Sequence, residues 1–151
     1  MIDIYSKGEY PANVLSNFYP NSFELDGVHC ASMEGFLQSL KFYSRKKQKK
    51  ICKLSGIAAK SSANTFINIR WKLTQSLYWQ GVRYRRSSSE YTQLVTRAFD
   101  SIYNNPEFKR ALVSTGNVNI KHSIGKQNKK DTVLTEKEFI EQLYRLRRKI
   151  L

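Results

Sequence analysis

The residues ASMEGFLQSLKF at positions 31–42 predict an amphipathic helix over about residues 33–43. Ser32 precedes this helix and can accept a hydrogen bond from a free amide of its first turn. Apolar side chains recur at helical spacing on the face that would be buried, at Met33, Phe36, Leu37 and Leu40. Polar side chains form a second stripe, at Glu34, Gln38 and Lys41. This stripe could line one wall of a polar site, and the alternative is an ordinary solvated helix face.

Glu34 stands out among the 12 Asp and Glu residues because most of the others have a structural explanation. Asp26 precedes Gly27 in a predicted two-residue hairpin turn. Three glutamates in the first turns of predicted helices offset the helix dipole, at Glu107, Glu136 and Glu138. Glu34 and Asp131 remain as candidates for chemistry. Glu34 lies near the amino end of its helix, where we expect the carboxylate to stay ionised.

A chain of 151 residues is long enough to bury one core, and we expect a single α+β domain over residues 1–151, mainly helical with a few short strands. The predicted strands are 23–25, 28–30 and 118–120. The further predicted helices are 46–60, 88–104, 106–116 and 136–149. The last of these has a capping box formed by Thr135 and Glu138. Residues 71–79 are rich in aromatic side chains and fit either a helix or a strand.

The composition argues against a membrane-spanning, secreted or metal-binding protein. No apolar stretch approaches the ~20 residues of a membrane helix, and Asp3 lies where a signal peptide would be basic. Cys30 and Cys52 are too few for a disulfide framework, and no Cys or His pair has the spacing of zinc ligands. No glycine-rich phosphate motif is present. We therefore expect a cytoplasmic protein with reduced thiols, no metal and no cofactor.

Basic residues outnumber acidic ones by 26 to 12, which gives a formal net charge of +14. Clusters of Lys and Arg attract phosphates at long range. We therefore expect an anionic partner, and the alternative is a basic surface that only favours solubility. The candidate contacts to nucleic acid are Lys46, Lys47 and Lys49 in one cluster and Arg83, Arg85 and Arg86 in another.

An ordered series of short motifs resembles the NADAR family, the NAD- and ADP-ribose-associated domains that include the YbiA-like proteins. The series begins with LSNFYP at residues 15–20 and includes the segment 31–42. It continues with LSG at 54–56, LYWQG at 77–81, SEY at 89–91 and HSIGK at 122–126. The last of these departs from the family pattern, because better-known members carry an Asp followed by Trp-Gly in that loop.

The resemblance implies a compact α+β fold and an N-glycosidase, which hydrolyses a ribosyl C1′–N bond. It places the catalytic glutamate of the family at Glu34, which would activate water and stabilise the cationic sugar. Some members remove ADP-ribose from guanine bases, and others cleave phosphorylated ribosyl-pyrimidine intermediates of riboflavin synthesis. We expect the first activity, with an ADP-ribosylated nucleobase or nucleic acid as the partner. The riboflavin-pathway activity and a nucleic-acid-binding module without catalysis are the alternatives.

The chemistry of an N-glycosidase suggests roles for several other residues, each with a purely structural role as the alternative. Asn17 and Gln38 would orient the water or the ribose hydroxyls. Lys41 and Lys60 would hold phosphate. His122 would protonate the leaving base or donate a hydrogen bond to it. The remaining candidates are Phe18 and Trp79 for stacking on a base, and Ser123 and Gly125 for a loop that contacts phosphate or ribose.

Overall fold

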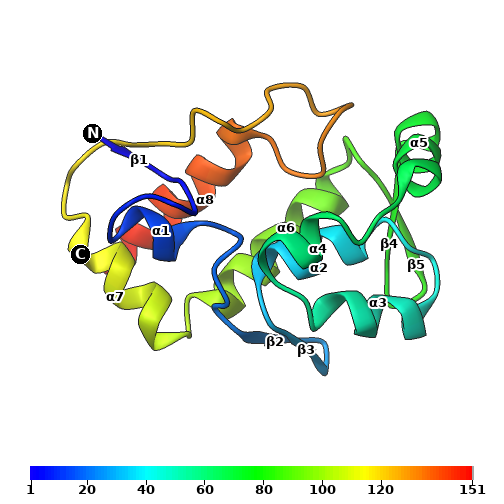
Figure 1. Ribbon diagram of the computed structural model, residues 1–151, viewed down its shortest axis with the longest axis horizontal. Coiled ribbons are helices and arrows are strands. Elements are labelled where there is room, and N and C mark those ends of the chain that lie inside the picture. The colour runs from blue at the N-terminus through cyan, green and yellow to red at the C-terminus, as the bar shows by residue number, and fades with distance from the viewer. Residues whose placement is uncertain (151) are drawn as a thin grey trace.

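The computed structural model describes residues 1–150, which form helices and three pairs of short strands in an α+β arrangement (Figure 1). The helices are α1 (Ala12–Leu15), α2 (Met33–Ser39), α3 (Arg45–Cys52), α4 (Gly56–Lys60), α5 (Thr65–Thr74), α6 (Ser89–Ile102), α7 (Pro106–Ser114) and α8 (Glu136–Arg148). The strands are β1 (Ile2–Asp3), β2 (Phe23–Leu25), β3 (Val28–Cys30), β4 (Ser76–Trp79), β5 (Val82–Arg85) and β6 (Ile120–Lys121). The predicted fold class is confirmed. Within residues 1–150, no helix is long and apolar enough to cross a membrane.

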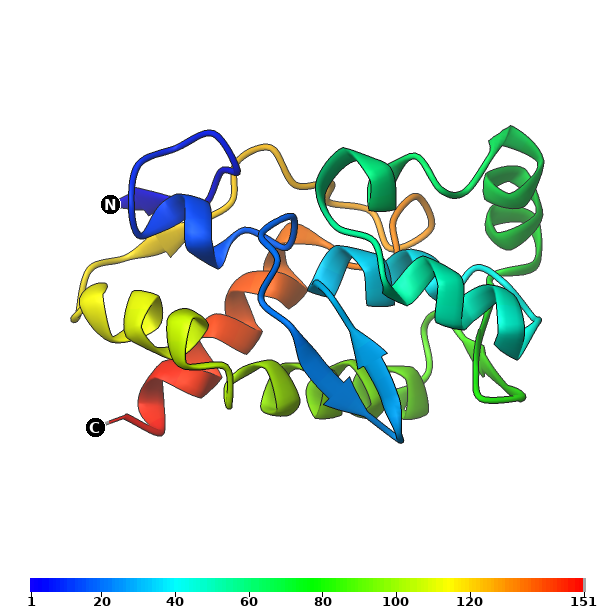
Figure 2. The same cartoon turned by 60° about the horizontal axis from the view of Figure 1, so that its bottom comes forward.

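The strands pair two by two and do not join into one sheet. β2 and β3 form the predicted antiparallel hairpin, and its turn residues Asp26 and Gly27 have φ angles of 50° and 77°. Such left-handed conformations are what a tight hairpin turn requires. β4 and β5 form a second hairpin, while β1 runs parallel to β6 and joins two distant parts of the chain. Figure 2 shows the β2–β3 hairpin lying across α6.

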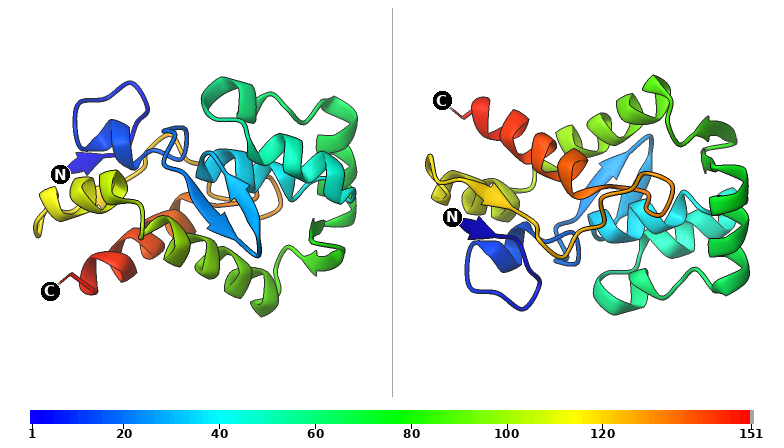
Figure 3. Two further views of the ribbon diagram at one scale, coloured as in Figure 1. Left: turned by 90° about the horizontal axis from the view of Figure 1, so that it is seen from below. Right: turned by 90° about the horizontal axis from the view of Figure 1, so that it is seen from above.

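The core lies between α2, α6 and α8, and these helices bury the faces that the sequence predicts. Phe99 of α6 and Phe139 of α8 are fully buried, with ring centroids 6.1 Å apart. α8 lies beside α6 and α7 in both views of Figure 3. The predicted capping box at the start of α8 is present, because Thr135 and Glu138 each accept a hydrogen bond from the other's backbone amide. Helix periodicity and capping together therefore determine where α2, α6 and α8 form and which faces they bury.

The amino end of α2 is fixed against the end of α3. Ser32 accepts a hydrogen bond from the Gly35 amide (3.0 Å) and donates one to the Leu54 carbonyl (2.9 Å). A Cβ atom on Gly35 would lie 2.5 Å from the same Leu54 carbonyl oxygen, so only glycine permits this approach. Glu34 lies between Ser32 and Gly35 in the chain, so this close packing fixes its position.

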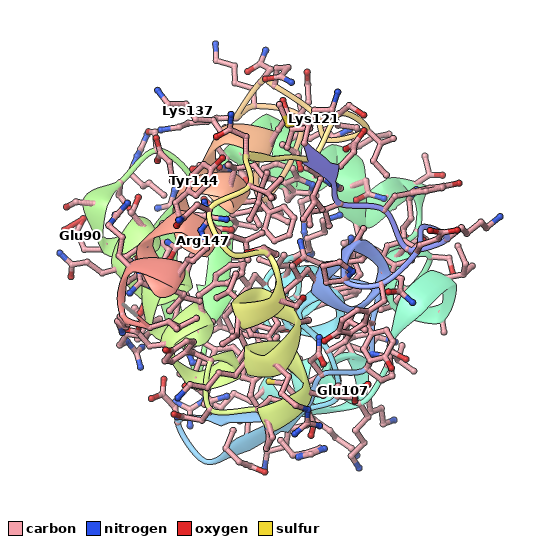
Figure 4. All side chains as sticks on the ribbon, turned by 90° about the vertical axis from the view of Figure 1, so that its left-hand side faces the viewer. Glu90, Glu107, Lys121, Lys137, Tyr144 and Arg147 are labelled. Carbon is pink, nitrogen blue, oxygen red and sulfur yellow. The ribbon has the colours of Figure 1, made fainter. Side chains whose placement is uncertain are left out.

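The strand that precedes His122 is fixed to α8. The Tyr144 hydroxyl accepts a hydrogen bond from the Ile120 amide (2.8 Å). Arg147 stacks over the Tyr144 ring, with 4.9 Å from its guanidinium carbon to the ring centroid, and donates to the Val118 carbonyl (2.7 Å). Figure 4 shows Tyr144 and Arg147 side by side on this face. These contacts hold β6 in place at the start of the loop that contributes to the site.

Two segments differ from the prediction because backbone geometry interrupts them. The predicted helix 46–60 is two helices, since the chain turns after α3 and Gly56 adopts a φ of 56° at the start of α4. The aromatic segment 71–79 is divided between the end of α5 and strand β4. Gln75, with a φ of 52°, ends the helix in a left-handed conformation.

Candidate functional site

A cleft of about 480 Å³ lies between α2, α5 and the loop that follows β6. Glu34 and Gln38 line it from α2, and Lys41 lines it from the turn that follows, because the helix ends at Ser39 and not at about residue 43 as predicted. The polar stripe therefore faces a cleft and not a flat, solvated surface. The loop that follows β6 runs alongside α2 in Figures 2 and 3. The lining also includes Asn17, Phe18, Lys60, Asn68, Trp71, Lys72, His122, Gly125, Lys126, Asp131 and Thr132.

The loop at Asn17 and Phe18 is held against the starts of two helices. The Glu34 amide donates to the Asn17 carbonyl (3.0 Å), and the Gly56 amide donates to the Phe18 carbonyl (3.1 Å). Gln38 then fixes the Glu34 carboxylate by donating from Nε2 to Oε2 (2.8 Å). The structure therefore brings Asn17, Phe18, Glu34 and Gln38 together, as the sequence predicts for a polar site.

Burial raises the pKa of the Glu34 carboxyl above its ordinary value, although the hydrogen bond from Gln38 and the charges of Lys41, Lys60 and His122 oppose the rise. The prediction that the amino end of the helix keeps Glu34 ionised took no account of this desolvation. A buried carboxylate binds a proton more tightly than an exposed one. Glu34 is therefore a stronger base than a surface glutamate, which suits a residue that takes a proton from water.

Lys41 is a buried cation with a neutral partner. Its side chain is only 9% exposed, and Nζ donates to the Asn68 side-chain oxygen (2.8 Å) and lies 6.0 Å from the centre of the Trp71 ring. Burial lowers the pKa of Lys41 to about 8, with the Glu34 carboxylate opposing the shift and the charges of Lys72 and Lys126 adding to it. The group is therefore mostly protonated at neutral pH, and an anion that enters the cleft would relieve its poor solvation.

Three further lysines line the cleft, so that four ammonium groups share it with the Glu34 carboxylate. Lys60, at the end of α4, holds Nζ 5.9 Å from the centre of the Phe18 ring. Lys72 comes from α5 and Lys126 from the loop after β6. One carboxylate among several cations suits a ligand that carries phosphates and develops positive charge at one carbon atom.

His122 enters the cleft from the end of β6. Its Nδ1 donates to the Ile4 carbonyl (2.9 Å), because a carbonyl can only accept, and this leaves Nε2 free to face a ligand. Gly125 lies close to the ring, since a Cβ atom there would be 2.7 Å from Cδ2 of His122. Ser123 does not line the cleft and instead binds the Asp3 carboxylate through its amide and hydroxyl. Of the predicted loop residues, the structure brings His122 and Gly125 to the site, while Ser123 fixes the loop.

The expectation that Trp79 stacks on a base is wrong. Its side chain is 1% exposed and packs edge-on against Phe36, with ring centroids 5.0 Å apart. The indole Nε1 donates to Asp26 (2.8 Å), which also pairs with Arg97. Trp79 is a core residue because β4 turns it inward, away from the cleft. Asp26 therefore contacts Trp79 and Arg97, which are distant in sequence, in addition to forming its own turn.

The expectation that Arg86 contacts nucleic acid is also wrong. Its side chain is 1% exposed and forms two hydrogen bonds with the Glu138 carboxylate, at 2.6 and 3.1 Å. Its Nε donates to the Thr132 carbonyl (2.8 Å). These contacts occupy the guanidinium inside the protein. Arg86 therefore anchors the loop that borders the cleft to the start of α8.

The other predicted nucleic-acid contacts are exposed and lie outside the cleft. Arg83 donates to the Ser76 hydroxyl (2.7 Å) on the neighbouring strand, and Arg85 lies at the end of β5. The cluster on α3 consists of Lys46, Lys47 and Lys49. Their exposure agrees with a surface role, and their contact with nucleic acid stays a prediction.

Sequence reasoning missed the contribution of α5 to the cleft. Asn68, Trp71 and Lys72 all come from this helix, although residues 65–70 belong to no predicted element and residues 71–79 fit either a helix or a strand. The Asn64 side chain caps its first turn by accepting from the Ile67 amide (2.9 Å), and this Asn was the available signal. Trp71 is in the core as expected, and it also borders the cleft.

Within residues 1–150, no three His, Cys, Asp or Glu side chains come together in a group that could hold a metal ion. The cleft carries four lysines, Lys41, Lys60, Lys72 and Lys126, and ammonium groups are donors that can bind phosphate.

Comparison with known proteins relates the chain to a phage family and to one bacterial fold. Residues 9–148 match the family described as bacteriophage protein GP30.3. An uncharacterized 17.1 kDa protein of the Gp30-rIII intergenic region in Enterobacteria phage T4 is 36% identical over 148 residues, which cover 97% of this chain and 96% of that protein. The NMR structure of the E. coli protein YbiA has a TM-score of 0.58 at 16% identity, and the match covers 99% of this chain and 83% of YbiA. The YbiA-like fold implied by the sequence resemblance is thereby confirmed.

Proposed function

The chain belongs to the bacteriophage protein GP30.3 family, and we propose that it is an N-glycosidase that removes ADP-ribose from ADP-ribosylated guanine in nucleic acid. The observation that carries this proposal is the partly buried Glu34 carboxylate in a cleft lined by four lysines. Breaking a glycosidic bond gives the ribose a positive charge in the transition state, which a nearby carboxylate stabilises. In a protein that only bound phosphates, this carboxylate would lower the affinity by repelling them.

In the proposed reaction, Glu34 takes a proton from a water molecule while the water oxygen bonds to C1′ of the ribose. The C1′–N bond breaks, its electron pair stays on the base nitrogen, and the imidazolium form of His122 supplies the proton that this nitrogen needs. The raised pKa of Glu34 makes it a better base for the first transfer. Gln38 would keep the carboxylate oriented toward the water, since it already holds Oε2.

The spread of cations along the cleft favours a substrate with a diphosphate. The four lysines line the cleft from separate segments, namely the turn after α2 (Lys41), α4 (Lys60), α5 (Lys72) and the loop after β6 (Lys126). A diphosphate ester and a phosphate monoester each carry about two negative charges at neutral pH, but the diphosphate divides them between two phosphoryl groups, which lysines from separate segments can contact together. Phe18, beside Lys60, offers an aromatic face for a base. The riboflavin-pathway intermediates are therefore the less well supported substrates.

The proposal is tested by incubating the purified protein with guanine-ADP-ribosylated DNA and, separately, with the phosphorylated ribosyl-pyrimidines. Chromatography would follow the release of free ADP-ribose or of ribose phosphate. We expect ADP-ribose and unmodified guanine from the first substrate and slower turnover of the second. The reverse preference would establish the riboflavin-pathway alternative, and turnover of neither substrate would contradict the proposed enzyme.

A further inference from the structure

A second depression, which we call the basic hollow, lies on the far side of the loop that borders the cleft. It encloses about 650 Å³ and is lined by Gln75, Arg85, Arg86, Ser87 and residues 127–130. The flanking loop residues Lys126, Asp131 and Thr132 line the cleft instead. One short loop therefore separates the two depressions, and a molecule that leaves the cleft across this loop reaches the basic hollow.

The basic hollow presents cations that the protein does not neutralise. Arg85, Lys129 and Lys130 are exposed, and among residues 1–150 none of the three forms an ion pair. No Asp or Glu of residues 1–150 lines the basic hollow. Arg86 is the exception among the basic residues, because Glu138 pairs with it. Three free positive charges thus face one hollow.

The loop that carries Lys129 and Lys130 is held by hydrogen bonds from Gln75, from Arg86 and from within the loop itself. Gln75, the residue that ends α5, donates from Nε2 to the Lys130 carbonyl (3.1 Å). Arg86 donates to the Thr132 carbonyl (2.8 Å), and the Asn128 side chain accepts from the Lys130 amide (3.0 Å). The loop is therefore fixed by three separate hydrogen bonds, which restrict the backbone that carries Lys129 and Lys130.

We propose that the basic hollow binds the sugar-phosphate backbone of a single-stranded nucleic acid whose modified base occupies the cleft. The proposal rests on the function proposed above, and it adds that the substrate is a polymer held on both sides of the loop. An enzyme that acts on a base must take it out of the duplex stack or use a single strand. The phosphates next to that base would then pass over the loop toward Arg85, Lys129 and Lys130, while Gln127 and Asn128 offer amide groups to the sugar and phosphate oxygens.

The test compares two variants that each remove three positive charges. The first is Arg85→Gln, Lys129→Gln, Lys130→Gln, in the basic hollow. The matched control is Lys46→Gln, Lys47→Gln, Lys49→Gln on α3, and the same comparison tests the competing prediction that this cluster contacts the nucleic acid. The control lies at the other end of the β4–β5 hairpin, because Arg45 of α3 binds the Gln80 carbonyl in the hairpin turn, whereas Arg85 pairs with Ser76 at the open end.

Binding is measured by fluorescence anisotropy with a labelled, unmodified DNA strand of about 16 nucleotides, since one single-strand binding site spans roughly 4 to 16 nucleotides. Each neutralised phosphate of a single strand contributes about 0.7 to the slope of log affinity against log salt, so three contacts give a slope near 2. Affinity of the wild type should thus fall roughly 20-fold between about 50 and 200 mM salt. The hollow variant should bind at least about tenfold more weakly at the lower salt and lose most of this slope.

A change of less than about threefold in the control, against the tenfold loss in the hollow variant, would support the proposal. Equal losses in both variants would overturn it, because net charge alone would then explain binding. Equal competition by polyglutamate of the same charge would also overturn it, since the surface would then bind any polyanion. Turnover of free ADP-ribosyl-guanosine should be unchanged in the hollow variant. Absence of turnover in the wild type would contradict only the glycosidase activity, whereas the binding of unmodified DNA tests the hollow directly.

Discussion

Replacing Arg86 with methionine should destabilise the protein by about 3 kcal/mol. Loss of one partner of a buried ion pair typically costs about 3 to 5 kcal/mol, because the other charge remains buried without compensation. The Glu138 side chain is 23% exposed and keeps its hydrogen bonds to Thr135, so we expect the lower end of that range. The variant also removes the donor to the Thr132 carbonyl.

Urea unfolding followed by circular dichroism measures this change, and the melting temperature should fall by roughly 6 to 12 °C for a chain of this size. The neighbouring variant Arg85→Met is the control, because that side chain is exposed, and its effect should stay within about 0.5 kcal/mol. Adding Glu138→Gln to Arg86→Met should cost at least about 1 kcal/mol less than the sum of the two single changes. A loss below about 1 kcal/mol for Arg86→Met would refute the reasoning that the pair stabilises the loop.

Three further predictions concern the cleft itself. Gly35→Ala should lower the free energy of unfolding by about 1 to 3 kcal/mol in urea titrations, because the added Cβ would clash with the Leu54 carbonyl oxygen; an unchanged value would contradict the close packing of α2 on α3. The KM for a phosphorylated substrate should rise above about pH 8, where Lys41 loses its proton, and Lys41→Arg should remove this rise; the same rise in that variant would exclude Lys41 as its source. Glu34→Gln should raise the melting temperature at neutral pH, because the raised pKa of Glu34 means that folding disfavours its ionised form. The gain should vanish at acidic pH, where Glu34 is protonated. A lower melting temperature of the variant at neutral pH would contradict the desolvation of Glu34.

The local signals of the sequence were sufficient for α2 and for the residues that it carries into the cleft. Ser32 caps the helix, the apolar face is buried, and Glu34 and Gln38 line the cleft, followed by Lys41 in the turn after the helix. These features depend on neighbours within one or two helical turns, which a sequence shows directly. The β2–β3 turn at Asp26 and Gly27 was predictable for the same reason.

Residues whose role depends on distant partners could not be placed in this way. Arg86 belongs to a basic run in the sequence, and only the fold brings Glu138 within 2.6 Å of it. Trp79 has the composition of a stacking residue, yet the strand in which it lies directs it into the core. The helix α5 was missed because its apolar residues do not form one face: Phe66 and Leu73 are largely exposed while Trp71 is buried. A period of 3.6 residues was therefore a poor guide there.

The most direct test of the proposed chemistry is the single-turnover rate of ADP-ribose release from guanine-ADP-ribosylated DNA by Glu34→Gln. The substitution keeps the shape of the side chain and removes the charge that the transition state needs, so the rate should fall by more than about 100-fold. Glu90→Gln, which changes an exposed glutamate on α6, is the matched control and should retain the wild-type rate. A wild-type rate in Glu34→Gln would contradict the assignment of Glu34 as the catalytic carboxylate.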